Sequence, residues 1–278
     1  MISMAYARNL VAGDGLVWAS ETPPVEGFTN PLWTASMTLP HVVPLAESHR
    51  SAAVQLFGLI LLMATVWRIR ALLCVHFAGG IRSPARWLPA AVLTAFFYPL
   101  SYWSLFGMET ALQALLAVVS VHLAYDVVFA GRDRHLALFV VFALAYLVRM
   151  DMAILIAIVG GWVALHGGFR QAARRRWLAG AALLGLAVVG YQVFRLAYFG
   201  EWLPNTYHLK LGGVPLDLRL ARGSAKLWAS IRETWAVWLG VALAIATSPG
   251  RPNRAFLPAM LLASYAAYSV WVGGDAWE

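Results

Sequence analysis

Residues 136–166 read LALFVVFALAYLVRMDMAILIAIVGGWVALH, an apolar run with two charged side chains, Arg149 and Asp151, at its middle. One continuous α-helix over this run would be about 46 Å long, whereas the hydrocarbon core of a bilayer is only ~30 Å thick. Two shorter helices joined at 149–151 fit better. Each would be roughly 20 Å long, so we expect the turn to lie below the outer surface of a membrane.

The positions of the basic residues support this two-helix interpretation. Twelve of the 21 Lys and Arg residues fall in four short stretches that end or separate apolar runs, a pattern typical of cytoplasmic loops. The stretch from Arg170 to Arg176 joins that side only if residues 136–166 cross twice. Because the net charge of +8 is concentrated in these stretches, we expect a lipid bilayer and no nucleic acid as the partner.

The composition indicates the same class of protein. Hydrophobic residues make up 61% of the 278 residues and charged residues 12%, against about 45–50% and 25% in soluble domains. The single cysteine, Cys74, cannot form an intramolecular disulfide, and no Cys or His spacing indicates a zinc site. His122 and Asp126 are interpreted as structural helix residues. We therefore expect an all-α, polytopic integral membrane protein.

The apolar runs predict about eight transmembrane helices in one domain, 1–278. Two of them are the arms of the hairpin at 136–166. The other six spans lie at 52–67, 87–103, 110–130, 177–199, 235–247 and 255–272. Residues 1–50 are expected outside, with 30–43 at the interface. Residues 200–234 form the longest outer loop, in which basic and apolar residues alternate over 216–228 as in an amphipathic interfacial helix.

On this map the remaining polar clusters all face the outer side. They lie at 26–31, 107–110, 149–151, 200–210 and 273–275, and ionisable groups at membrane depth usually mark a site or pathway. Alternatives remain open for each. Arg149 and Asp151 either neutralise one another or bind a phosphate and a sugar hydroxyl, and Glu109 either favours a helix N-terminus or acts in a site.

The order of these motifs resembles bacterial GT-C-type glycosyltransferases, most closely the AftB-type terminal arabinofuranosyltransferases. The matching segments are Ala7-Arg8-Asn9-Leu10, Gly13 to Val17, Pro23 to Trp33, Gly107-Met108-Glu109-Thr110, Tyr198 to Tyr207 and Gly273-Gly274-Asp275. The Arg-Pro-Asp-Gly turn of that family corresponds here to Arg149-Met150-Asp151-Met152. The resemblance covers nearly the whole chain.

The resemblance implies transfer of a sugar, arabinofuranose being one candidate, from a polyprenyl-phosphate donor to a cell-envelope glycan acceptor. The reaction would occur on the outer face of a bacterial cytoplasmic membrane. In that family the catalytic base candidate is an acidic residue that would precede this chain, so the remaining catalytic candidates here are Asp151, Glu109 and Asp275. The donor phosphate-binding candidates are Arg149, Lys210 and Arg195, and the substrate-binding candidates are Glu26, Asn30, Asn205 and His208. No metal ligand is assigned, although the acidic residues are compatible with a divalent metal cofactor.

The chain departs from the family at both ends. The family begins with a further membrane helix and an Asp-Asp pair before the segment matched by Ile2-Ser3, and it continues beyond Gly-Gly-Asp. We therefore expect an interior part of such an enzyme. The alternatives are a catalytically incomplete fragment or assembly subunit, or a lipid or sugar transporter, although inverted repeats and midplane charges typical of transporters are not evident.

Overall fold

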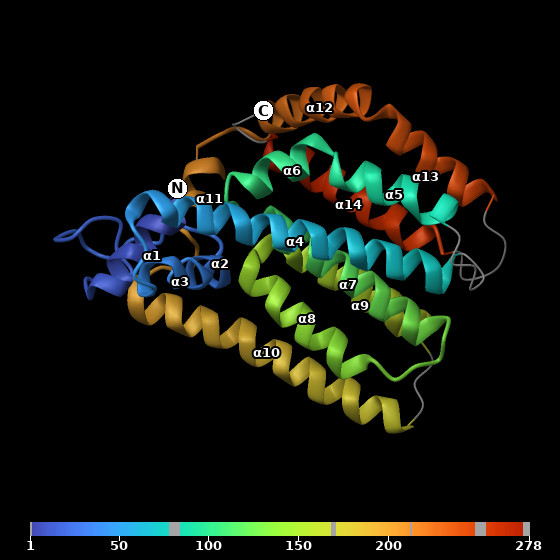
Figure 1. Cartoon of the computed structure of the whole chain (residues 1–278), viewed down its shortest axis with the longest axis horizontal. Coiled ribbons are helices and arrows are strands. Elements are labelled where there is room, and N and C mark those ends of the chain that lie inside the picture. Colours follow the sequence, from blue (N-terminus) through green and yellow to red (C-terminus); the bar gives the residue numbers. More distant parts are fainter. Residues whose placement is uncertain (1, 78–83, 168–170, 212, 248–253, 275–278) are drawn as a thin grey trace. The chain divides into compact units, whose positions relative to one another are not determined.

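The computed structural model describes residues 2–77, 84–167, 171–211, 213–247 and 254–274 (Figure 1). All regular elements in these ranges are helical, so the all-α prediction is confirmed. Within these ranges, three helices are long and apolar enough to cross a bilayer: α4 (Glu47–His76), α7 (Thr110–Val128) and α10 (Gln171–Phe199). A bent pair, α12 and α13, would make a fourth if it forms one span. These helices indicate a membrane protein.

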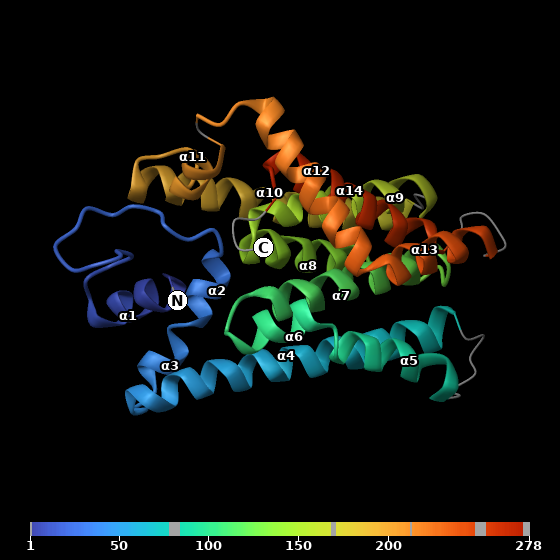
Figure 2. The same cartoon turned by 90° about the horizontal axis from the view of Figure 1, so that it is seen from above.

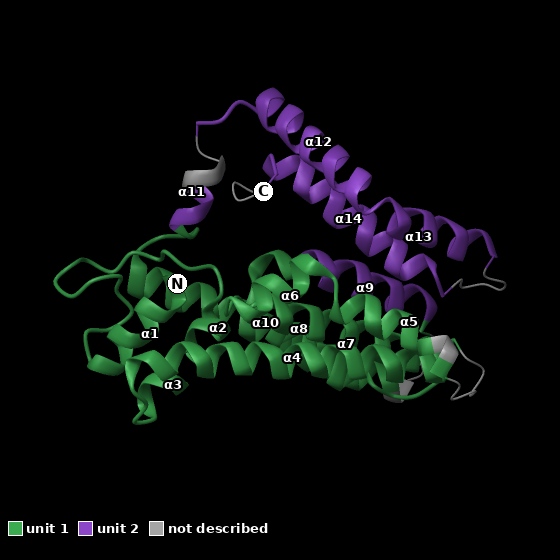
Figure 3. Ribbon diagram, turned by 45° about the horizontal axis from the view of Figure 1, so that its top comes forward, with its two compact units in different colours: residues 1–153, 167–204 green, residues 154–166, 205–278 purple. Residues whose placement is uncertain are grey.

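The chain divides into two compact units (Figure 3). Unit 1 comprises residues 1–153 and 167–204, and unit 2 comprises residues 154–166 and 205–278. Each unit has its own helix packing.

Unit 1 is built around α4, α7, α8 (His135–Val148) and α10, which run side by side (Figures 1 and 2). Helix α8 packs against both α7 and α10, and α4 packs on α7. The shorter helices α5 (Pro84–Ala95) and α6 (Tyr98–Leu105) lie along α4. Near the N-terminus, α1 (Ile2–Ala12), α2 (Pro31–Ser36) and α3 (Leu39–Val42) pack together.

Close helix packing in unit 1 depends on aromatic and small residues. Trp33 is almost completely buried and stacks on Phe57, with 5.6 Å between ring centroids. Gly58 of α4 lies so near the backbone of Ser104 in α6 that a Cβ atom there would overlap the Ser104 carbonyl oxygen. Small residues allow this approach where helices associate without help from the hydrophobic effect of water.

Helix α4 is longer than the sequence predicts. The expected span 52–67 ended before Arg68, but the helix continues to His76 and carries Arg68 and Arg70 on it. Arg, Ala and Leu are all good helix formers, and a long Arg side chain reaches polar surroundings from within a helix. The charges therefore do not terminate the helix.

The expected span 87–103 is divided into α5 and α6. Phe97 adopts extended backbone angles (φ −67°, ψ 104°), and Pro99 lies in the first turn of α6. In a continuous helix the Pro99 ring would clash with the carbonyl of Ala95, four residues earlier, whereas a proline in the first turn is tolerated. A single continuous helix over this range was therefore wrong.

The expected interruption of residues 136–166 is confirmed. Helix α8 ends at Val148, Arg149 is extended (φ −157°, ψ 135°), and a single 3₁₀ turn, η1 (Met150–Met152), follows. Helix α9 (Ala153–His166) then begins and belongs to unit 2. The break exposes backbone and side chains of 149–151 to interactions that a continuous helix would not allow.

Unit 2 also contains α11 (Asn205–Leu211), α12 (Leu216–Glu233), α13 (Trp235–Thr247) and α14 (Phe256–Val272). Helix α12 packs on α14 with Gly223 directly against the Val270 backbone. The chain bends by 80° between α12 and α13. The predicted amphipathic helix at 216–228 is thus confirmed as a helix and extends to Glu233.

Candidate functional site

The break after α8 brings one arginine between two carboxylates. Arg149 donates from Nη1 to Glu109 Oε1 (3.3 Å) and from Nη2 to Asp151 Oδ2 (2.6 Å). Glu109 is buried, with 5% of its side chain exposed, whereas Arg149 is 33% and Asp151 15% exposed. Of these three groups, the Arg149 guanidinium is the one most accessible to a ligand.

Glu109 is held from its other side by the N-terminal segment. Asn30 donates from Nδ2 to Glu109 Oε2 (2.8 Å). The Asn30 oxygen accepts hydrogen bonds from the hydroxyls of Ser3 (2.9 Å) and Thr34 (3.1 Å). Because hydroxyl donors occupy the oxygen, the amide nitrogen is directed at the carboxylate. Both oxygens of Glu109 are therefore satisfied.

A glycine turn places Glu109 at the start of α7. Gly107 has φ +77°, in the left-handed region that favours glycine. Its carbonyl accepts a hydrogen bond from Trp33 Nε1 (3.2 Å). An acidic side chain at a helix N-terminus is stabilised by the helix dipole. Glu109 therefore has both interactions considered from the sequence: it lies at the N-terminus of α7, and it contacts Arg149.

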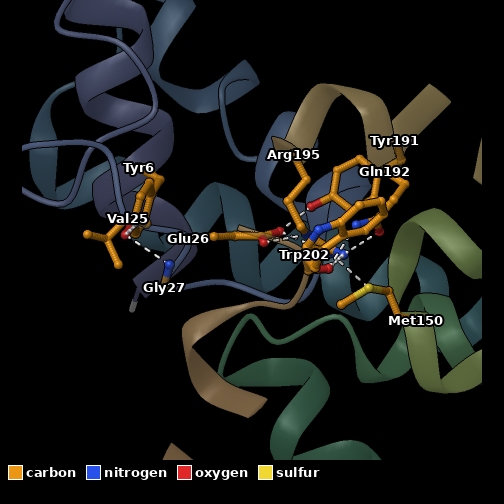
Figure 4. A network of polar contacts seen from close by, with 9 residues as sticks. All are labelled: Tyr6, Val25, Glu26, Gly27, Met150, Tyr191, Gln192, Arg195 and Trp202. Atoms are coloured by element: carbon orange, nitrogen blue, oxygen red, sulfur yellow. Dashed lines mark hydrogen bonds and ion pairs between the residues drawn. The ribbon is translucent and has the colours of Figure 1, made fainter. Parts of the chain in front are cut away.

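A second network lies around Arg195 of α10 (Figure 4). Arg195 donates from Nε to Glu26 Oε2 (2.6 Å) and from Nη2 to Oε1 (3.3 Å), and the Tyr191 hydroxyl donates to the same carboxylate. The two charged side chains are only 1% and 2% exposed. This is a buried, bidentate, charge-assisted pair.

The remaining donors of Arg195 reach neutral acceptors. Nη1 donates to Gln192 Oε1 (2.9 Å) and to the Trp202 carbonyl (3.4 Å), and Nη2 contacts the Met150 sulfur at 2.9 Å. Met150 follows Arg149 directly in the chain. The second network therefore extends to the same 3₁₀ turn that carries the first.

Tyr6 fixes the chain on both sides of Glu26. Its hydroxyl donates to the Val25 carbonyl (2.6 Å) and accepts from the Gly27 amide (3.1 Å). Burial raises the pKa of Tyr6, and the neighbouring Glu26 charge adds to this rise while the Gly27 hydrogen bond opposes it. Tyr6 is therefore a neutral hydrogen-bonding group that holds the Glu26 backbone in place.

Six of the ten predicted site residues meet in unit 1: Glu26, Asn30, Glu109, Arg149, Asp151 and Arg195. The geometry of two of them differs from the expected roles. Arg195 was expected near the donor phosphate and Glu26 near substrate, but their charged groups bind each other inside the protein. Their positions lie 169 residues apart in the chain, so the sequence does not reveal the pairing.

The other four predicted residues lie elsewhere or outside the description. Asn205 and His208 are exposed on α11 of unit 2. Lys210 has its backbone in α11, but its side chain lies outside the described part of the structure. Asp275 is outside the described residues altogether.

Several residues of the two networks were not predicted: Ser3, Thr34, Met150, Tyr191, Gln192 and the Trp202 carbonyl. A signal existed for two of them. Tyr191, Gln192 and Arg195 are polar residues at positions i, i+1 and i+4 of an otherwise apolar helix, where i and i+4 share a face. Such clustering at membrane depth indicates a shared partner.

One carboxylate oxygen of the site has no hydrogen-bond partner among the described residues. Asp151 Oδ1 is buried and accepts no hydrogen bond from any described residue. Arg149, Glu109 and Asp151 together carry a formal charge of −1. A group that donates a hydrogen bond, such as a sugar hydroxyl, therefore matches this acceptor.

No protein-family model, curated protein or solved structure matches the chain.

Proposed function

We propose that the chain is a membrane glycosyltransferase of the GT-C type. It transfers a sugar, with arabinofuranose as the first candidate, from a polyprenyl-phosphate donor to a glycan acceptor on the extracytoplasmic side. The observation that supports this most directly is the unpaired, buried Asp151 Oδ1 beside the partly exposed Arg149, at a break in an apolar helix. In the proposed topology the chain crosses the membrane about eight times.

The apolar helices suit a donor of this chemistry. A polyprenyl tail is compatible with lipid-facing helix surfaces, while its sugar-phosphate head requires polar partners. Residues 149–152 interrupt the helix and supply such partners at the end of α8. The 33% exposed Arg149 donates charge-assisted hydrogen bonds to the donor phosphate. The buried Glu109 orients the Arg149 guanidinium.

In the proposed step, an acceptor hydroxyl oxygen forms a bond to the anomeric carbon of the donor sugar. The bond from that carbon to the phosphate oxygen breaks, and polyprenyl phosphate leaves. The hydroxyl proton passes to Asp151, whose Oδ1 is available to accept it. A positioned carboxylate base of this kind contributes typically 10²–10⁴-fold in rate.

Purified protein in lipid nanodiscs tests the proposal with a radiolabelled polyprenyl-phosphoryl arabinofuranose and an arabinan oligosaccharide. We expect transfer by the wild type and a loss of about 10²–10⁴-fold in kcat for Asp151→Asn. Glu47→Gln, a change at a side chain that is 90% exposed, is the control and should retain full activity. Equal activity of the two variants would remove Asp151 from the mechanism.

A second candidate is a non-catalytic assembly subunit of such an enzyme. The buried pairing of Glu26 with Arg195 favours it, because these charges stabilise the fold rather than face a ligand. A folded wild type that binds the labelled donor but transfers no sugar would support this alternative and refute the enzyme proposal.

A further inference from the structure

Two histidines and an aspartate converge at the end of α7 remote from Glu109. His122 and Asp126 are four residues apart on α7 and share a face, and His76 is the last residue of α4. One ligand atom from each lies within 4.8 Å of the others, and all three residues are buried. Seventeen residues separate Asp126 from Glu109, about 26 Å of helix, so this cluster is distinct from the site at Arg149.

The histidine on α7 has an unsatisfied polar atom. His122 is more than nine-tenths buried, and its Nδ1 has no hydrogen-bond partner among the described residues. A buried, unpaired polar atom typically costs about 1–3 kcal/mol. The rings of His76 and His122 pack edge to face, with 5.3 Å between their centroids. The arrangement places imidazole nitrogens next to a carboxylate inside the helix bundle.

The carboxylate of the cluster already has outer partners. Asp126 Oδ1 lies 3.3 Å from His76 Nε2 and 3.1 Å from Arg132 Nη1, and Oδ2 lies 3.8 Å from Arg134 Nε. Both arginine side chains are about half exposed, so solvent screens their charge. They correspond to the groups that hydrogen-bond metal-ligating carboxylates in proteins and orient them.

We propose that His76, His122 and Asp126 bind one divalent transition-metal ion, with zinc as the best match. Imidazole and carboxylate ligands suit zinc and cobalt, and three protein ligands leave a fourth position for water. The ion would satisfy the unpaired His122 nitrogen and tie the end of α4 to α7. The sequence did not indicate it because His76 lies 46 positions before His122 and 50 positions before Asp126.

Metal titration of the purified protein tests this site independently of glycosyl transfer. Protein without a polyhistidine tag is stripped with a chelator in detergent and titrated with Zn²⁺ by calorimetry and with Co²⁺ by visible absorption. We expect one equivalent of each metal, d–d bands of a low-symmetry Co²⁺ site, and a higher Tm in the metal-loaded form.

His122→Ala should weaken the affinity for both metals by at least 10–100-fold, the range found when even outer partners of a metal site are removed. His49→Ala is the matched control, because His49 is exposed near the other end of the same helix as His76. The melting temperature of stripped His122→Ala establishes that the variant is folded. Absence of stoichiometric binding in the wild type, or equal affinities in the two variants, would overturn the proposal.

Discussion

Neutralising Glu26 should destabilise the protein strongly, because it leaves a buried guanidinium without its counter-ion. In Glu26→Gln the side-chain volume is almost unchanged, but Arg195 keeps only neutral acceptors: Gln192, the Trp202 carbonyl and the Met150 sulfur. Removing one partner of a buried ion pair typically costs about 3–5 kcal/mol. At 2–4 °C per kcal/mol, this predicts a decrease in Tm of roughly 6–20 °C.

The double variant separates the pair from its neighbours. Arg195→Met alone should also destabilise, because Glu26 then retains Tyr191 as a donor but no positive charge. In Glu26→Gln/Arg195→Met no buried charge remains, so its Tm should lie above that of either single variant. Such non-additivity is the expected signature of two directly interacting groups.

Thermal denaturation in detergent, followed by circular dichroism at 222 nm or an equivalent far-ultraviolet signal, supplies the measurement. Glu47→Gln provides the control, since its side chain is 90% exposed and surface changes usually stay within ±0.5 kcal/mol. A buried ion pair between Glu26 and Arg195 is refuted if Glu26→Gln melts with the control, or if the double variant melts below both single variants.

Two further predictions concern packing and pH. Gly58→Ala should lower Tm by the equivalent of about 1–3 kcal/mol, because the added methyl group overlaps the α6 backbone. Gly190→Ala adds its methyl group in open space, so it should be neutral or slightly stabilising in the same melting assay. The hydrogen bond with His135 and the nearby positive charge of Arg176 hold the pKa of Asp133 below its ordinary value of 3.8. The ionised Asp133 therefore stabilises the folded protein above that pH. This stabilisation is lost as the pH falls through the pKa of Asp133 in the folded state. Tm should consequently fall more steeply between about pH 5 and pH 3 in the wild type than in Asp133→Asn, and parallel profiles would contradict this.

The sequence predicted the helices whose limits depend on composition and local chemistry. The break at Arg149 followed from the excessive length of a single helix and from two charges in an apolar run. The bounds of α13 coincide with the predicted 235–247, since Thr234 and the polar stretch after Thr247 limit the apolar segment. Helix breaks and helix ends of this kind can be predicted from the sequence because they depend on residues that are neighbours in the chain.

The features that the sequence did not predict depend on residues distant in the chain or on charged residues within a helix. Nothing near Arg195 in the sequence indicates that Glu26 neutralises it. Arg68 and Arg70 suggested a loop, although they continue α4. The same limitation concealed the approach of His76 to His122.

The N-terminal segment has a specific role in the energetics of unit 1. It supplies Glu26, which neutralises Arg195, and Asn30, which orients Glu109 toward Arg149. Without Glu26, the buried Arg195 would lose its counter-ion, and removal of one partner of a buried ion pair typically costs about 3–5 kcal/mol. The two arginines also differ in exposure. Arg195 is 1% exposed and Arg149 33%, and Arg195 Nη2 contacts the sulfur of Met150, the residue that follows Arg149.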